Sequence, residues 1–282
     1  MSITLDYAVP GVGAAEIFTL FYHFRADVPR FEDTERADHA QLRFRLSPGG
    51  ATYHFADGSV QDAPAHHVVG PTSGAMRVVA EGPVHVFGAG ITPAGWAAIT
   101  GASASAFLNR VVDANSLLGC AVGGAAAALG RATDTTDMVA IVESMIGEWV
   151  ADARRQSSFV AQVDAWLANS HSPEVDDLVN ATGLSRRQVE RRCNALYGAP
   201  PKLLARKYRA LKAAVALAAH EQDADKLIER GFYDQSHFIR EVKQFTGLTP
   251  SQLRDHPNLL AQLTIAGRHA LTGQINPMIS ET

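Results

Sequence analysis

The sequence has few of the residues that stabilise secreted or metal-dependent small domains. Its 282 residues include only two cysteines, Cys120 and Cys193, which lie far apart. Two isolated thiols give no zinc-ligand spacing, and their scarcity is typical of a reducing compartment. We therefore expect a cytoplasmic protein that needs no structural metal or disulfide, because a chain of this length can bury an ample core.

Long apolar runs and a leader segment are also missing. No stretch approaches ~18 consecutive apolar residues, so we expect no membrane-spanning helix and no membrane partner. The first ten residues, MSITLDYAVP, lack the basic segment and apolar run of a signal peptide. The composition, 46% hydrophobic and 19% charged, is that of an ordinary globular protein.

Signatures of catalysis are absent as well. The glycine-rich segment 119–124 has no Lys-Ser/Thr pair for a phosphate, and no Gly-x-Ser-x-Gly nucleophile motif occurs. No His-x-His pair with a downstream glutamate is present, and adjacent histidines point to opposite sides of a strand. We therefore expect no enzymatic activity, no cofactor and no metal. The histidines considered are His54, His66, His67 and His85.

Lysine is missing from the first 170 residues. These residues hold 10 Arg, no Lys and 17 acidic residues, a net charge of −7. Residues 171–282 hold 15 Lys and Arg against 12 acidic residues, a net charge of +3. A polyphosphate partner needs positive charge on one face, not a basic whole chain. The overall charge of −4 therefore does not exclude a nucleic-acid partner for the second segment.

The first 92 residues are predicted to form strands. Short apolar runs alternate with turn signals such as Pro48-Gly49-Gly50. A spacing of about 8–12 residues is typical of a sandwich or barrel. Such a shape commonly holds a small ligand or forms an interface. The expected strands are Ile17–His23, Gln41–Leu46, Ala51–Phe55, His67–Val69, Met76–Val79 and Val84–Phe87.

From about Ala94 onward the pattern favours helices. Short helices are expected over 95–129, and longer ones over Thr136–Trp149 and Phe159–Ala168. The first longer helix has an apolar face that suits either an interface between two copies or packing on its own domain. That face is formed by Met138, Ile141, Met145 and Trp149. A polar segment, 169–173, follows as a linker, with Ser172 as the expected cap of the next helix.

Residues 174–255 contain an internal repeat. Ser185–Leu204 aligns with Asp234–Leu253 at an offset of 49 positions (185 to 234). Two copies indicate one supersecondary unit used twice, since a solenoid needs three or more. The matching pairs are Val189 with Phe238, Arg191 with Arg240, Cys193 with Val242, Leu196 with Phe245, Gly198 with Gly247, and Pro201 with Pro250.

Each copy of the repeat predicts a helix-turn-helix. In the first, a helix over Val175–Ala181 ends at Gly183, and Ser185 caps a second helix with Gln188 as its capping-box partner. In the second copy, Lys226–Arg230 is followed by Gly231 and by a helix capped by Asp234. The second helix of each copy has one apolar side and one polar side, which is typical of this motif.

One long helix, Pro200–His220, is predicted to join the two copies at a fixed separation. Its basic residues are candidate phosphate contacts, although the exposed side of a long helix commonly carries such charges. These residues are Lys202, Arg206, Lys207 and Arg209.

The second copy carries the most specific motif, Gly-Phe-Tyr-Asp-Gln-Ser-His-Phe at 231–238, followed by Arg240, Phe245 and Thr249-Pro250. It resembles the DNA-binding domain of the AraC/XylS family of bacterial transcription regulators. The first copy resembles it more loosely, through Leu178, Gly183, Ser185-Arg186, Val189, Arg191, Gly198 and Pro201. The stretch from Gly88–Pro93 through Arg110–Asp113 to Leu118-Gly119 resembles sensor-like domains that precede such modules.

The resemblance implies that the two units enter successive major grooves on one face of DNA. The base-contact candidates that it implies are Arg187, Glu190 and Arg191 in the first unit, and Ser236, His237 and Arg240 in the second. Arg186, Gln235 and Lys202 complete the expected DNA-binding set. Glu190 departs from the neutral residues common at its position. It either accepts a hydrogen bond from cytosine N4 or forms an ion pair without touching DNA.

These features predict an α+β protein with a β-rich N-terminal barrel or sandwich, a helical extension and an all-α C-terminal domain. The expected domains are a sensor or dimerisation domain (1–155), a DNA-binding domain (156–257) and a C-terminal tail (258–282). We expect an effector-responsive, sequence-specific transcription regulator that forms a homodimer. Its partners would be double-stranded DNA, a small-molecule effector and RNA polymerase. The alternatives are an enzymatic or metal-binding N-terminal barrel fused to the same module, and a purely structural dimerisation domain.

Overall fold

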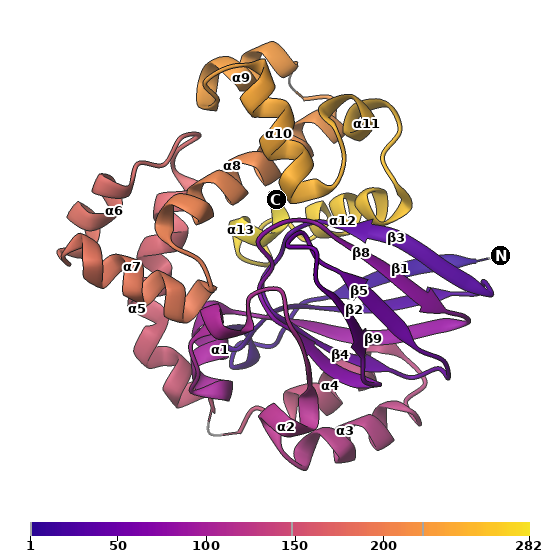
Figure 1. Ribbon diagram of the computed structural model, residues 1–282. Helices are drawn as coiled ribbons and strands as arrows, with labels where there is room; N and C mark the ends of the chain where they lie inside the picture. Colours follow the sequence, from indigo (N-terminus) through magenta and orange to yellow (C-terminus); the bar gives the residue numbers. More distant parts are fainter. Residues whose placement is uncertain (1, 148, 222) are drawn as a thin grey trace.

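The computed structural model describes residues 2–147, 149–221 and 223–282. A β-sandwich forms the N-terminal part, a layer of helices lies beneath it, and further helices lie above and beside it (Figure 1). Within the described residues, no helix is long and apolar enough to cross a membrane. The predicted α+β class is confirmed, and of the expected shapes, a barrel or a sandwich, the protein has the sandwich, because the strands form two separate sheets.

Both sheets are antiparallel throughout. The larger has the strand order β1-β2-β9-β4-β7-β10, and the smaller has the order β3-β8-β5-β6. The strands are β1 (Ile3–Ala8), β2 (Phe18–Ala26), β3 (Arg30–Glu35), β4 (Gln41–Arg45), β5 (Ala51–His54), β6 (Val60–Ala63), β7 (His66–Val69), β8 (Met76–Glu81), β9 (Val84–Ile91) and β10 (Val111–Asp113).

Six strands were expected from the sequence, and the structure contains each of them with small shifts at the ends. The four that the sequence did not predict are β1, β3, β6 and β10, and each lies at an edge of its sheet. Edge strands face solvent along one side and carry polar residues that keep other chains from pairing with them. The β3 sequence, Arg-Phe-Glu-Asp-Thr-Glu, therefore shows little apolar alternation.

The larger sheet is covered on both faces. Phe21 and Phe87 on one face pack against the helical layer, which contributes Val122 and Val142. The other face packs against the smaller sheet. The helices of this part are α1 (Pro93–Thr100), α2 (Ala114–Leu118), α3 (Ala121–Leu129), α4 (Thr135–Glu143) and α5 (Trp149–Ala168), with 3-10 helices η1 (Ala14–Glu16) and η2 (Ala104–Phe107).

The predicted helix over Thr136–Trp149 is partly wrong. Helix α4 ends at Glu143, and α5 begins at Trp149 after a turn in which Gly147 has a φ of 32°. The apolar face proposed for dimerisation is thus divided between two helices. Its residue Met138 is 2% exposed and packs inside the same chain.

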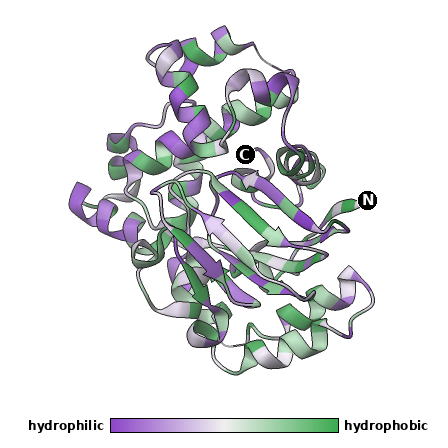
Figure 2. Cartoon of the chain, turned by 45° about the vertical axis from the view of Figure 1, so that its right-hand side comes forward, coloured by the Kyte–Doolittle hydropathy of each residue, from purple (hydrophilic) through white to green (hydrophobic). Residues whose placement is uncertain are grey.

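The remaining helices follow the predicted repeat. They are α6 (Val175–Thr182), α7 (Arg186–Tyr197), α8 (Pro201–Ala218), α9 (Ala224–Gly231), α10 (Gln235–Thr246), α11 (Pro250–Asp255), α12 (Leu259–His269) and α13 (Pro277–Ser280). Figure 2 shows mostly hydrophilic residues on the upper and left-hand helices, and more hydrophobic ones in the layer beneath the sandwich. Helix α12 folds back onto β1 and β3, and α13 packs against α5.

Candidate nucleic-acid interface and interdomain cavity

The first helix-turn-helix consists of α6 and α7. Ser185 caps α7 in a reciprocal capping box with Gln188, as predicted, and Gly183 ends α6 in a left-handed conformation. The cap predicted for α6 was Ser172, but the helix begins later, after Glu174. Val189 and Cys193 are fully buried, so the opposite side of α7 faces solvent.

The exposed side of α7 carries the predicted contact residues. Arg187, Glu190 and Arg191 are exposed, and within the described residues their side chains make no hydrogen bond or ion pair. Arg186 is also exposed but pairs with Asp176 at 2.5 Å. An exposed ion pair contributes little stability, so this arginine remains available to exchange partners.

The second helix-turn-helix consists of α9 and α10. Asp234 caps α10, as predicted, by accepting a hydrogen bond from the His237 backbone N–H. Phe238 and Phe245 are buried against α8 and its neighbours. Gln235, Ser236 and Arg240 are exposed, which agrees with their predicted position on the outer side.

His237 differs from its neighbours on α10. Its Nε2 lies 3.0 Å from Glu241, and its side chain is only 30% exposed. Glu241 is 1% exposed and also accepts hydrogen bonds from Arg206 (2.5 Å) and Arg209 (2.7 Å) on α8. The sequence did not single out Glu241, because an acidic residue in a polar helix looks exposed until the helix that packs over it is known.

Ile239 is a further outward residue of α10 that the sequence did not single out. It is 38% exposed and lies one residue before Arg240. Tyr233, in the turn before α10, is 92% exposed. Single exposed apolar residues are common on protein surfaces, so their exposure alone marks no site, but an apolar side chain beside Arg240 suits contact with a thymine methyl group.

Helix α8 joins the two units and was predicted to offer four basic residues to phosphate. Only Lys202, in its first turn, is exposed without a partner in the described part of the chain. Arg206 and Arg209 bind Glu241, and Lys207 is 5% exposed. For Lys207 the prediction of an exposed charge is wrong, because α8 packs on the sandwich as well as on its own units.

A cavity of about 130 Å³ lies where the sandwich meets α8, α10, α11 and α12. Its apolar wall includes Leu5, Phe24, Val86, Leu211, Leu260 and Ile265. Four arginines also line it: Arg36, Arg43, Arg45 and Arg268. Neither the cavity nor its arginines were expected, because they come from segments far apart in the sequence.

Of the four histidines considered, His54, His67 and His85 make side-chain hydrogen bonds, whereas the buried Nδ1 of His66 has no partner among the described residues. His67 is buried, with Nε2 3.1 Å from the Tyr53 hydroxyl and Nδ1 2.8 Å from the Pro64 carbonyl. Burial lowers its pKa to about 3, so it is neutral at pH 7. His85 Nε2 lies 2.6 Å from His23 Nε2. The described residues contain no group of three or more His, Cys, Asp and Glu placed to hold a metal ion.

Residues 178–256 match a family model described as a helix-turn-helix domain. The match begins within α6 and ends just after α11, so it contains both units and the helix that joins them. This segment is an AraC-type helix-turn-helix domain, and the chain is a DNA-binding transcription regulator. The resemblance found in the sequence is thereby confirmed.

The regulator is also similar to solved structures of ToxT from Vibrio cholerae. One overlaps with a TM-score of 0.43 at 9% identity, over 82% of this chain and 96% of that one. ToxT bound to (E)-4-(8-methylnaphthalen-1-yl)but-3-enoic acid overlaps with a TM-score of 0.44 at 11% identity, over 89% and 98%. At these values neither structure assigns a ligand or a residue role to this regulator. No curated protein sequence matches it.

The DNA-binding domain of the regulator is docked on the sandwich at equivalent points of the repeat. The glycines that end α7 and α10 have φ values of 77° and 79°. Gly198 lies against Pro71, and a Cβ at Gly247 would stand 2.4 Å from Thr34. The C-terminal ends of α7 and α10 therefore face the sandwich, and their N-terminal ends are exposed.

Backbone hydrogen bonds strengthen this docking. The Ala37 N–H donates to the Phe245 carbonyl at 2.7 Å, and the Ala75 N–H donates to the Gln244 carbonyl at 2.8 Å. Lys207 Nζ donates to the Asp38 carbonyl at 2.8 Å. Helices α8 and α10 are therefore hydrogen-bonded directly to loops of the sandwich, and one of these loops contributes Arg36 and Asp38 to the wall of the cavity.

Proposed function

We propose that the regulator binds two successive major-groove segments of duplex DNA, α7 entering one and α10 the next. The observation that carries this proposal is the pair of outward helix faces, joined by α8, on which Arg187, Arg191 and Arg240 have no hydrogen-bond or ion-pair partner among the described residues. The contact set is Arg186, Arg187, Glu190 and Arg191 on α7, with Gln235, Ser236, Arg240 and Ile239 on α10. His237 would support α10 through Glu241 more than contact a base.

Selection of binding sites from random DNA tests this proposal directly. The full chain should enrich two short sequence elements whose centres lie about one helical turn, or ~10 base pairs, apart. Enrichment of only one element would contradict the proposed use of both units.

Lys202 is proposed to contact a phosphate at the start of α8. Replacing it by alanine should lower affinity equally for all sequences and reduce the slope of log K against log salt by about one. Fluorescence anisotropy over a range of salt concentrations measures that slope. Arg131→Ala removes an exposed cation from the N-terminal part and serves as the control. An unchanged slope for Lys202→Ala would mean that this lysine stays in solvent.

We further propose that the protein acts in the cytoplasm as an effector-responsive regulator without enzymatic activity. The interdomain cavity supports the proposal that an effector binds, because a ligand there would touch both the sandwich and helices α8, α10 and α11 of the DNA-binding domain. We also propose RNA polymerase as a second macromolecular partner.

Homodimerisation remains a prediction. Sedimentation of the full chain at tens of micromolar should show a species of about twice the 30.2 kDa chain mass. Since the residues first proposed for the interface are divided between α4 and α5, the contact would have to use another surface. A monomer at that concentration would remove the homodimer from the proposed function.

A further inference from the structure

Helix α12 forms one wall of the interdomain cavity. It lies across an edge strand of each sheet, β1 of the larger and β3 of the smaller (Figure 1). Its inner face contributes five residues to the cavity wall, which are Leu260, Ala261, Thr264, Ile265 and Arg268. The cavity is therefore closed on this side by a helix that follows the DNA-binding domain in the chain.

Few buried side chains hold α12 in this place. Of its eleven residues, only Leu260 and Arg268 are buried. Burying a leucine stabilises a structure by about as much as leaving one or two polar groups buried without a partner destabilises it. Among the described residues, the Nε and Nη1 groups of Arg268, and those of Arg36 on the other side of Asp38, are buried without a hydrogen-bond partner. The gain from closing α12 is thus largely offset, and we expect a small free-energy difference between its closed and lifted positions.

The connections at both ends of α12 are exposed. Residues 254–256 precede it and are exposed, as is most of the turn 270–274 that follows it. Beyond that turn the chain is fixed again, because Asn276 donates to Asp164 of α5 at 2.7 Å and Met278 is buried in the main core. Helix α12 can therefore lift at its two connections while α11 and α13 stay in place.

Two carboxylates of the sandwich bind the closed helix. Asp33 of β3 accepts a hydrogen bond from the Leu260 backbone N–H at 3.0 Å and another from the Asn258 side chain, at the positive N-terminal end of α12. Asp38 accepts a hydrogen bond from Arg268 Nη2. Bonds to water replace these bonds when the helix lifts, so they determine its closed position more than they stabilise it.

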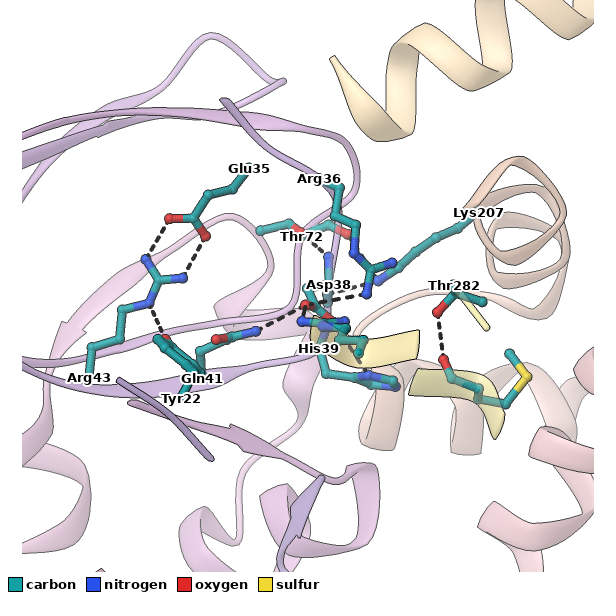
Figure 3. Close-up of polar contacts among 12 residues, drawn as sticks. Tyr22, Glu35, Arg36, Asp38, His39, Gln41, Arg43, Thr72, Lys207 and Thr282 are labelled. Carbon is teal, nitrogen blue, oxygen red and sulfur yellow. Dashed lines mark hydrogen bonds and ion pairs between the residues drawn. The ribbon is translucent and has the colours of Figure 1, made fainter. Parts of the chain in front are cut away.

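Segment 36–38 joins α12 to the DNA-binding domain. The carboxylate of Asp38 binds α12, while its backbone carbonyl accepts a hydrogen bond from Lys207 Nζ of α8 at 2.8 Å. The Ala37 N–H donates to the Phe245 carbonyl of α10 at 2.7 Å. Figure 3 shows Asp38 and Lys207 together at this junction. A movement of α12 therefore acts on a segment that contacts both α8 and α10.

We propose that α12 is a lid that opens and closes the interdomain cavity, and that segment 36–38 transmits its position to α8 and α10. This proposal rests on the proposed effector-responsive function, and it adds the route by which the cavity exchanges its contents and acts on the DNA-binding domain. Opening itself needs no ligand, because few contacts hold the closed helix. It can therefore be measured on the protein alone.

Hydrogen exchange of the full chain, followed by mass spectrometry, tests the lid. In the wild type, the protection factors of the α12 amides should be lower than those of β2 and β9 by about tenfold or more, because the lid opens without unfolding of the sandwich. Equal protection of α12, β2 and β9 would mean that α12 leaves the sandwich only when the sandwich unfolds, which would overturn the proposal.

Two variants assign the opening to the contacts of α12. A Cβ at Gly267 would overlap the ring of Tyr7 on β1, so Gly267→Ala pushes the helix away from the sandwich. Asp33→Ala removes the acceptor at the start of α12. Each should lower the protection of α12, and of the peptide that contains Ala37, by about tenfold or more, while β2 and β9 keep theirs. Gly124→Ala in α3, where an added Cβ meets nothing within 4 Å, is the matched control and should change neither.

The outcomes separate the lid from its link to the reading helices and from the proposed function. Unchanged protection of α12 in both variants would overturn the lid. A loss of protection in α12 with none at Ala37 would overturn the transmission through segment 36–38. Because the exchange measurements use neither DNA nor a ligand, a wild type that binds no DNA would count against the proposed function alone.

Discussion

Replacing Arg240 or Arg191 by alanine is expected to weaken operator binding by about ten- to a hundredfold each. The two arginines occupy the same position of the repeat, and both are exposed. An arginine that enters the major groove donates two parallel hydrogen bonds to O6 and N7 of guanine, which contribute roughly 1–3 kcal/mol of discrimination. Neither side chain has a competing partner among the described residues, so both are free to make these bonds.

Each variant should lose base preference at a different place. Binding-site selection with Arg191→Ala should relax one base pair, and with Arg240→Ala another about 10 base pairs away, since α8 holds the two units at a fixed separation. Arg131→Ala should leave the selected sequence unchanged. If both arginine variants keep the wild-type preference at every position, these residues do not contact bases and the outward faces of α7 and α10 were wrongly assigned.

Replacing Glu241 by alanine is expected to destabilise the second unit by about 3 kcal/mol. The carboxylate is buried and holds Arg206, Arg209 and His237. Removing one partner of a buried ionic cluster leaves the others uncompensated, which typically costs about 3–5 kcal/mol. The lower end applies because Arg206 is 36% exposed and can recover solvation. Denaturant unfolding measures the change, and Glu190→Ala, which removes an exposed glutamate from α7, should stay within about 0.5 kcal/mol.

The pH dependence of stability provides a second test of Glu241. Burial by itself would raise the pKa of Glu241, but hydrogen bonds from Arg206 and Arg209 lower it below its ordinary value of 4.5. A carboxyl group with a lowered pKa stabilises the fold above its ordinary pKa, and this stabilisation is lost as the pH falls through the folded value. The difference in stability between the wild type and Glu241→Ala should therefore be constant from pH 7 down to about pH 4.5 and should shrink as the pH falls further. A difference that stays constant below that pH as well would mean that the charge of Glu241 contributes nothing.

The two helix-turn-helix units and their boundaries could be predicted because their signals are local. Ser185 and Asp234 cap helices within one turn, and the glycines at 183, 198 and 247 end them. The apolar spacing within each helix fixed the buried side and hence the side that carries Arg191 and Arg240. The same reasoning failed at His237, because the partner that turns its side chain inward, Glu241, acts together with residues of another helix.

The strands were predictable where they are central and not where they are edges. The central strand β9, Val-His-Val-Phe-Gly-Ala-Gly-Ile, is largely apolar, whereas the edge strand β3 is mostly polar. Pairing partners decide whether such a segment becomes a strand, and no short window of sequence contains them. The two sheets and their order therefore emerge only from the assembled fold.

The sequence by itself determined the DNA-binding half of the protein, because helix periodicity, caps and a repeated motif all act over a few residues. The tertiary structure decided the cavity and its charges. Asp38 and Arg268 are 230 positions apart, and they meet only because α12 folds back over the sandwich. Burial also decided the environment of the charged side chains. Lys207 and Glu241 look like surface residues in the sequence, but they are buried because α8 packs on both the sandwich and α10. Among the described residues, the Nε and Nη1 groups of Arg36 and Arg268 are buried without a hydrogen-bond partner where the sandwich meets α12.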